Sequence, residues 1–292
     1  MREVRIRLGI LAVVLALAVP AGTTRAAAGG TCPRGASNCL DATIAQMQQQ
    51  FEAEAATCDH TAVFTLAYLR VTQTYRWAGG LPGFFADTAW VDREDSLFAG
   101  YYFQAFGDDQ AGRAGVPAAW SIAFDAARHH SVTALGDALL GMNAHINRDL
   151  PYVLAAIGLT GPGGASHKPD HDKIQQLLAA TIQPVLDEIA ARFDPTATQY
   201  GGLGTAGALQ LIATWRDLAW HNAELLAAAP TPEARSLVAL TIEATSAVEA
   251  EALVATNGYL PLLQSSAPSD HWCAAHGADA PPTPYAFGPA TA

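Results

Sequence analysis

The sequence predicts an all-α protein, a compact multi-helix bundle of about eight helices. Apolar residues recur at spacings of three and four along almost the whole chain after residue 28, and alternation with a period of two is nearly absent. Clusters of Gly and Pro separate these periodic segments, as expected for loops between helices. Half of the 292 residues are hydrophobic and only 15% are charged. The chain therefore has enough apolar material for a core of its own.

Residues 1–28 have the pattern of a secretory signal peptide. Three arginines precede an apolar run over 9–20, and small residues follow up to Ala28. The run is shorter than the ~20 apolar residues that a membrane-spanning helix needs, and no later segment is apolar on all sides. We therefore expect a secreted protein without a membrane span, with a single all-α domain over 29–263 and an extended Pro/Ala-rich tail over 264–292.

Periodicity and capping residues give the boundaries of the expected helices. In chain order these are 40–57, 60–77, 92–106, 117–130, 132–157, 171–193, 205–228 and 232–257. Asp59, Asp92 and Asp170 stand at expected N-caps, because a short carboxylate side chain accepts hydrogen bonds from the free N–H groups of a first turn. Pro184 predicts a kink in its helix. Gly and Pro gather in the intervening loops, over 79–83, 107–117, 161–169 and 200–204.

Four cysteines in an exported chain predict two disulfides. A helix over 41–57 would hold Cys39 and Cys58 ~26 Å apart, far beyond the Cα separation that a disulfide tolerates, so this pairing is excluded. Of the two remaining arrangements we prefer Cys32 with Cys39, across a short turn, and Cys58 with Cys273. The second bridge would pin the tail to the helical domain.

Charge and motifs narrow the range of functions. The formal net charge is −11, and the 16 basic residues include only two lysines, Lys168 and Lys173. No basic stripe is present that would neutralise the phosphates of a nucleic acid, so the sequence argues against DNA and RNA as partners. The G-x-S-x-G, Walker, Rossmann and H-E-x-x-H motifs of common hydrolases, nucleotide enzymes and zincins are absent. The expected partner is a small-molecule substrate.

Two pairs of residues have the spacing of metal ligands. His145 and Asp149 are four residues apart, so both lie on the same face of the helix expected over 132–157, beside its core stripe. Asp217 and His221 repeat this spacing beside a second stripe, formed by Leu211, Trp215, Leu218 and Leu225. Two facing helices would thus supply nitrogen and oxygen ligands to a divalent metal, Zn²⁺ first, with Mn²⁺ or Fe²⁺ as alternatives.

His171 is the fifth predicted ligand, because it falls on the inward stripe of its helix, and His167 is a further candidate in the loop before it. A bound metal would lower the pKa of a water molecule, with Asp149 or Asp217 as general base. The sequence thus predicts a metal-dependent hydrolase of a phosphoester or similar small ester. The alternative is a non-catalytic exported binding module whose polar residues satisfy one another. A non-haem iron enzyme fits less well, since no Glu-x-x-His pair occurs.

We interpret the remaining polar groups as structural. His129 and His130 end a helix, where the C-terminal dipole favours a cation. His60 stands at the start of a helix, beside its N-cap. Glu94 and Asp95 fall in the first turn of the helix expected over 92–106, where acids favour the N-terminal dipole.

The segment 142–151, Met-Asn-Ala-His-Ile-Asn-Arg-Asp-Leu-Pro, resembles an actinobacterial family that is known as a domain of unknown function. The likeness extends to 64–72, to the aromatic segment 98–106 and to 215–225, and so to most of the chain. More distantly, an exported helical protein with His-x-x-x-Asp is similar to the zinc-dependent phospholipase C and single-strand nuclease group. Those enzymes also use an N-terminal Trp and further His after the Asp, whereas Asp149 is followed by Leu-Pro-Tyr. The analogy concerns the fold alone.

Overall fold

Helices make up the regular secondary structure of the chain in this computed structural model. The structure describes residues 39–198, 204–260, 263–282 and 285, and no β-strand occurs among them. In chain order the elements are α1 (Cys39–Ala55), α2 (Thr61–Gly79), α3 (Thr88–Gln110), α4 (Ala118–Arg128), α5 (Ala134–Asn143), η1 (Ala144–Asp149), α6 (Leu150–Ile157), η2 (Pro162–Gly164), α7 (Lys168–Arg192), α8 (Gly204–Ala228), α9 (Pro232–Asn257) and α10 (Ala267–His276). The predicted all-α class is confirmed.

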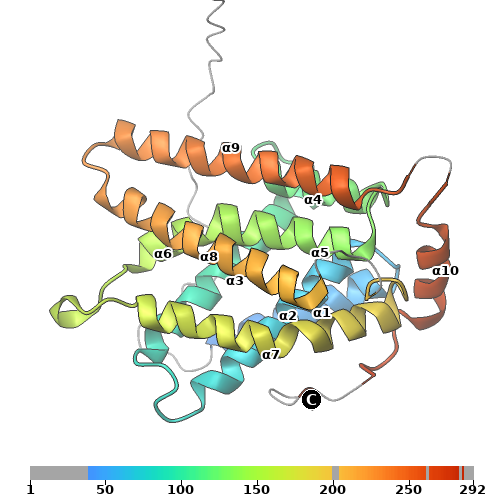
Figure 1. Cartoon of the computed structure of the whole chain (residues 1–292), viewed down its shortest axis with the longest axis horizontal. Helices are drawn as coiled ribbons and strands as arrows, with labels where there is room; N and C mark the ends of the chain where they lie inside the picture. Colours follow the sequence, from blue (N-terminus) through green and yellow to red (C-terminus); the bar gives the residue numbers. More distant parts are fainter. Residues whose placement is uncertain (1–38, 199–203, 261–262, 283–284, 286–292) are drawn as a thin grey trace, which may run out of the picture.

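The core lies around α2, which is buried along most of its length. This helix packs against α1, α3, α5 and α7. Trp90 of α3 and Trp120 of α4 are among the largest side chains that are fully buried in the core. Figure 1 shows α9 along one side of the bundle and α7 along the other, with α5 and α6 between them and α10 at one end. Side chains that point inward from facing helices therefore share one interior.

Two helices, α3 and α7, begin earlier than the sequence predicts. α3 begins before Asp92, since the Asp87 carboxylate accepts a hydrogen bond from the Trp90 backbone N–H at 2.9 Å. α7 begins before residue 171, and Asp170 does not cap it. The two carboxylate oxygens of Asp170 instead accept hydrogen bonds from the backbone N–H groups of Ala86 and Asp87, at 2.8 Å each. Asp170 thereby fixes the loop that leads into α3.

The helix predicted over 132–157 is continuous but not uniform. Thr133 caps α5, where its hydroxyl accepts a hydrogen bond from the Gly136 backbone N–H at 3.2 Å. Between α5 and α6 lies η1, a six-residue π-helical segment. Such segments are rare and often lie at functional sites. A π-turn shifts the faces on which later residues lie, and a simple 3.6-residue periodicity does not reveal it.

We predicted an extended tail over 264–292. This prediction is wrong in part, because the helix α10 forms within it. Pro268 stands in the first turn, where proline is tolerated, and Asp270 in the same turn favours the N-terminal dipole. A disulfide joins Cys58, just before α2, to Cys273 of α10, with a Cα separation of 5.9 Å. This is the second of the predicted bridges. It fixes α10 against the helical domain.

Three predictions concern residues that the structure does not describe. These are the signal peptide over 1–28, the bridge between Cys32 and Cys39, for which Cys32 lies outside the described residues, and most of the loop over 200–204. Among the described helices, none combines the length and the apolar character that a membrane crossing requires.

Candidate functional site

The π-helical segment η1 carries His145 and Asp149, and both side chains are buried in the bundle. Asp149 Oδ2 accepts a hydrogen bond from the Trp120 indole N–H at 2.8 Å and lies 3.4 Å from His145 Nδ1. Asp149 Oδ1 accepts a hydrogen bond from the Arg148 guanidinium at 2.8 Å. Both oxygens of Asp149 thus have protein partners. The carboxylate is part of a buried polar network, and this does not fit its predicted role as an open metal ligand and general base.

His145 lies in a cage of aromatic rings. Its ring stacks on that of Phe98, with centroids 3.3 Å apart, and lies 4.3 Å from that of Tyr68. Three further rings have centroids 5.8 to 6.4 Å away, those of Phe64, Tyr102 and Trp120. Burial lowers the pKa of His145, although Asp149 acts in the opposite direction. The oxygens of Asp149 accept hydrogen bonds from Trp120 and Arg148, so His145 Nδ1 faces an acceptor and carries the proton, and the buried Nε2, which has no partner, is a bare acceptor.

His171 of α7 is buried, as the sequence predicts, and belongs to a second polar group of the interior. The Arg216 guanidinium of α8 donates to His171 Nδ1 at 3.1 Å and to the His171 carbonyl oxygen at 2.8 Å. Burial, together with the Arg216 charge, lowers the pKa of His171. The Glu94 carboxylate lies 3.7 Å from the same Nδ1. His171 is therefore a neutral imidazole, and its Nε2 carries the proton because guanidinium only donates.

We predicted that Glu94 and Asp95 lie in the first turn of their helix and favour its dipole. The structure shows that they lie further along it. α3 starts earlier than expected, and each side chain is only 1% exposed. Burial and the neighbouring Glu94 charge raise the pKa of Asp95 well above its ordinary value. A signal for this burial is present in the sequence, because Trp90, Glu94 and Phe98 are spaced by four and so share one helical face.

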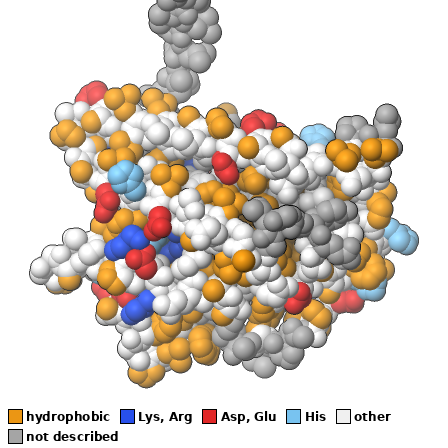
Figure 2. All heavy atoms as spheres, viewed as in Figure 1, with side chains coloured by type: hydrophobic (Ala, Val, Ile, Leu, Met, Phe, Trp, Pro, Cys, Tyr) orange, Lys and Arg blue, Asp and Glu red, His pale blue; other side chains and the backbone are white. Residues whose placement is uncertain are grey.

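Asp217 and His221 do not face the interior, which corrects the prediction for both. Their side chains are 72% and 63% exposed, and Asp217 pairs with Lys168 at 3.1 Å. Figure 2 shows acidic and basic side chains mixed at the end of the molecule where α7 begins. α8 turns another face inward, with Ile212, Trp215, Ala219, Ala223 and Leu226 buried. We assigned the stripe to the larger leucines, whereas close helix packing favours alanine on the buried face.

The five predicted ligands therefore do not converge on one centre. Within the part of the chain that the structure describes, one set of at least three His, Cys, Asp or Glu side chains has ligand atoms within 4.8 Å of one another. It consists of His60, His130 and Asp270, and we call it the His60 centre. We had interpreted both histidines as structural. Their convergence is not visible in the sequence, because the three residues come from distant segments of the chain.

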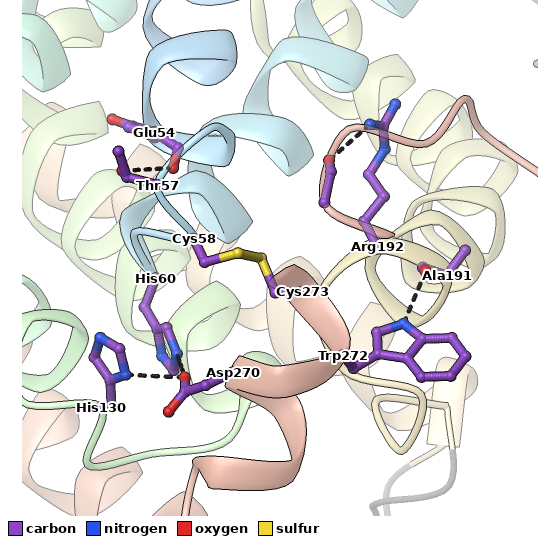
Figure 3. Close-up of a disulfide and its surroundings, with 11 residues drawn as sticks. Glu54, Thr57, Cys58, His60, His130, Ala191, Arg192, Asp270, Trp272 and Cys273 are labelled. Atoms are coloured by element: carbon purple, nitrogen blue, oxygen red, sulfur yellow. Dashed lines mark hydrogen bonds and ion pairs between the residues drawn. A yellow bond between two sulfur atoms is a disulfide. The ribbon is translucent and has the colours of Figure 1, made fainter. Parts of the chain in front are cut away.

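Hydrogen bonds define the geometry of the His60 centre (Figure 3). His60 Nε2 and His130 Nδ1 lie 3.0 and 2.9 Å from the same Asp270 oxygen, Oδ1. His60 Nδ1 lies 3.0 Å from Asp137 Oδ2. The two imidazole rings stack with centroids 3.9 Å apart. Asp137 is buried and His60 mostly so, whereas His130 and Asp270 are about one third exposed. The centre is thus anchored inside the protein and open on one side.

The charges of the centre hold a proton on His60. Burial lowers the pKa of His60, but Asp137 and Asp270 more than offset this effect and raise the pKa to about 9. Burial raises the pKa of Asp137 to about 6, although His60 acts against the shift. In the metal-free protein at neutral pH, His60 is therefore an imidazolium between two carboxylates. A metal ion that binds here must displace this proton.

Backbone strain is concentrated beside the same centre. Among the described residues other than glycine, Cys58 and His130 have positive φ, at 53° and 47°. The left-handed region is uncommon for such residues, and the conformations persist where the surrounding structure holds them. Cys58 is bound by the disulfide, and His130 by its hydrogen bond to Asp270. The fold therefore stabilises an unfavourable backbone where these side chains meet.

A small cavity links the His60 centre to the cage around His145. Its volume is about 20 Å³, which is room for about one water molecule. Residues of both groups line it, His60 and Asp137 from the centre and Phe64, Tyr102 and Trp120 from the cage. Asp137 Oδ1 is buried and has no hydrogen-bond partner. A water molecule in this cavity would have a carboxylate acceptor within the lining.

Comparison with known proteins gives a family. Neither a search of curated proteins nor a search of solved structures finds a match. A family model does match, over residues 40–256. The matched region holds the helices from α1 to α9, with the interior polar groups and with His60 and His130. It does not include α10, which carries Asp270. The chain therefore belongs to the Family of unknown function (DUF5995).

Proposed function

We propose that the protein is an exported metal-dependent hydrolase of a small ester, a phosphoester or similar, and that its divalent metal binds at the His60 centre. The observation that carries the proposal is the convergence of three nitrogen and oxygen ligand atoms within 4.8 Å on a partly exposed surface. Catalytic zinc sites characteristically have three protein ligands and one position open to water. The disulfide between Cys58 and Cys273 is compatible with an oxidising compartment.

The residues around the centre have the arrangement that such a site requires. His60 would bind through Nε2, because its Nδ1 donates to Asp137. A carboxylate behind a ligating histidine fixes the orientation of the ring and raises its basicity. The metal, when bound, lowers the pKa of a water ligand towards 7. Asp137 would stay behind the ring as the orienting carboxylate, and the water ligand would release its proton to solvent on the open side of the centre.

The charge of the loaded centre favours a substrate with little net charge. A divalent cation with Asp137 and Asp270 ionised and both histidines neutral sums to about zero. A phosphodiester monoanion or a neutral ester is then not repelled, whereas the chain's net charge of −11 disfavours polyanions. The resemblance of the His145 segment to the zinc-dependent phospholipase C group, and the actinobacterial origin, stay predictions, because the proposed centre uses other residues.

The test compares zinc binding and ester hydrolysis in matched histidine variants. In His60→Gln and His130→Gln, zinc affinity should fall at least tenfold, and zinc-dependent hydrolysis of bis(p-nitrophenyl) phosphate or p-nitrophenyl acetate should be lost. His129→Gln is the control, since His129 is exposed and bonds only to the Asp125 carbonyl of its own helix. Equal zinc binding in all three variants would refute the metal site. Zinc binding without hydrolysis would refute the enzyme and leave a structural metal.

A second candidate function is the non-catalytic exported binding module. The observation in its favour is the network around Asp149, in which His145, Trp120 and Arg148 contact both oxygens of the buried carboxylate and leave neither open to a metal. This function predicts that no purified preparation hydrolyses either ester, with or without zinc.

A further inference from the structure

The outward side of α9 is apolar and exposed. Leu237, Leu240 and Val248 are 66%, 48% and 71% exposed, and Ala244, between them, is exposed as well. Because successive residues of an α-helix are turned by about 100°, these four side chains lie on one side of α9, and we call this surface the α9 face. Figure 2 shows hydrophobic side chains along the edge of the molecule where α9 lies. The opposite side of the helix carries its buried residues, Ile242, Ser246, Ala250 and Leu253.

The α9 face differs from the outward side of an ordinary surface helix, which is polar or charged. The acids nearest to it on the same side are Glu233 and Glu251, one beyond each end of the apolar stretch. Arg235 and Glu243 bond instead to the neighbouring elements α8 and η1. An exposed apolar stretch that charged residues bound in this way is typical of a surface at which another molecule binds.

The side chains of the α9 face are placed symmetrically about Ala244. Leu240 and Val248 stand four residues before and after it, and the small Ala244 side chain lets a second helix approach closely. When two copies of α9 lie antiparallel and cross at Ala244, Leu240 of each copy contacts Val248 of the other. A two-fold interface requires such a self-complementary patch, because the same surface of both subunits forms it. The pattern therefore favours a second copy of this chain as the occupant.

The charges at the ends of the α9 face favour the same arrangement. In an antiparallel pair, Glu251 lies opposite Leu237 of the second copy, and Glu233 lies opposite Ala255. In a parallel pair, each of these acids would lie beside its own counterpart, and the like charges would repel each other. The net charge of −11 also opposes contact between two copies through acidic surfaces. The α9 face is a surface on which two acidic chains can meet without this repulsion.

The exposed apolar surface continues onto α8. Leu218 and Leu225 are 41% and 43% exposed. They lie on the side of α8 away from Trp220, whose ring contacts Lys168 and His171 of α7, and therefore toward α9, which packs against α8. With 26 residues α9 is ~39 Å long, so a surface two helices wide covers about 800 Å². Each partner of a standard stable interface buries about this area.

We propose that the protein forms a two-fold symmetric homodimer through the α9 face, with its two α9 helices antiparallel and crossing at Ala244. Leu240 and Val248 form the central contacts, and Leu218 and Leu225 of α8 border them. This inference goes beyond the proposed function and does not depend on it, because no residue of α9 belongs to the His60 centre.

Light scattering coupled to size-exclusion chromatography tests the dimer. The wild-type protein should elute with twice the mass of one chain. Leu240→Glu and Val248→Glu bring carboxylates into the contact and should raise the dimer dissociation constant about 100-fold. Leu81→Glu is the matched control, since Leu81 is an exposed leucine outside α8 and α9, and this variant should stay dimeric. A wild-type protein that remains a monomer up to about 100 µM, or glutamate variants of α9 that remain dimers, overturns the proposal.

Cysteine cross-linking tests the antiparallel geometry. Under mild oxidation, Ala244→Cys should give a disulfide-linked dimer, because both copies of residue 244 lie at the two-fold axis. Leu237→Cys should not, because its two copies would lie ~21 Å apart at 1.5 Å per residue along the helices. Links through both cysteines would show parallel helices, and no link through Ala244→Cys would show that the contact lies elsewhere. Either result overturns the proposal.

The same variants distinguish other occupants of the α9 face. If a monomeric wild-type protein binds phosphatidylcholine vesicles, and Val248→Glu abolishes this binding while Leu81→Glu does not, the face binds a lipid surface and the dimer is overturned. Zinc affinity should be unchanged in Leu240→Glu. Loss of the dimer and failure of the metal centre are therefore separate results.

Discussion

His60 is the residue on which the proposed hydrolytic centre depends most, because each of its ring nitrogens faces a different carboxylate. Asp137 contacts Nδ1 and Asp270 contacts Nε2, both at 3.0 Å. The same ring therefore serves either as an imidazolium in the metal-free protein or as an oriented ligand in the loaded one. Proton and metal compete for Nε2, so zinc affinity should fall as the pH decreases below about 9.

The raised pKa of His60 also predicts how the stability of the metal-free protein depends on pH. The proton on folded His60 stabilises the protein fully below the unfolded pKa of about 6.5, and this stabilisation is lost as the pH rises through about 9. The loss amounts to about 3 kcal/mol. Asp137, with its pKa near 6, changes charge below this range.

Chemical denaturation in the presence of a chelator, between pH 6.5 and pH 9.5, measures this loss. His60→Gln should flatten the dependence, and His129→Gln should leave it unchanged. A wild-type protein whose unfolding free energy stays constant across this range would contradict the imidazolium between two carboxylates.

At the scale of elements, α10 is the segment that completes the centre. It carries Asp270. The disulfide between Cys273 and Cys58 fixes α10 to the domain at a position three residues after Asp270 in the sequence. Its remaining anchors are few, among them the hydrogen bond from the Trp272 indole to a backbone carbonyl of α7. The sequence predicts this bridge but not the helix, because a short segment with Pro and Ser gives a weak helical pattern by itself.

Removal of the disulfide should therefore affect stability and metal binding together. In the double variant Cys58→Ser/Cys273→Ser, unfolding free energy should fall by about 2–5 kcal/mol, since the bridge joins residues 215 positions apart. Zinc affinity should fall at least tenfold, because α10 no longer presents Asp270. The Asp270→Asn variant keeps the disulfide. Its zinc affinity should also fall, but its unfolding free energy should fall less than that of the double variant. Unchanged zinc affinity in the double variant would show that α10 is not part of the site.

For the whole molecule, the sequence predicts what depends on local pattern and misses what depends on packing. Most helices follow from apolar spacing and from the Gly and Pro between them. The inward face of α8 does not, because its buried alanines are less conspicuous than the exposed Leu218 and Leu225. The His60 centre cannot be found in this way at all. Its residues stand just before α2, just after α4 and on α10, and only the tertiary fold brings them together.

A crystal structure of the zinc-loaded protein, with anomalous data at the zinc edge, tests the central claim most directly. We predict an anomalous peak on the open side of the His60 centre, about 2.0–2.2 Å from His60 Nε2, from one ring nitrogen of His130 and from one oxygen of Asp270. Asp137 should remain hydrogen-bonded to His60 Nδ1 behind the metal. A zinc-soaked crystal with no peak there, and with Asp270 still bound to both histidines, would contradict the proposed metal centre.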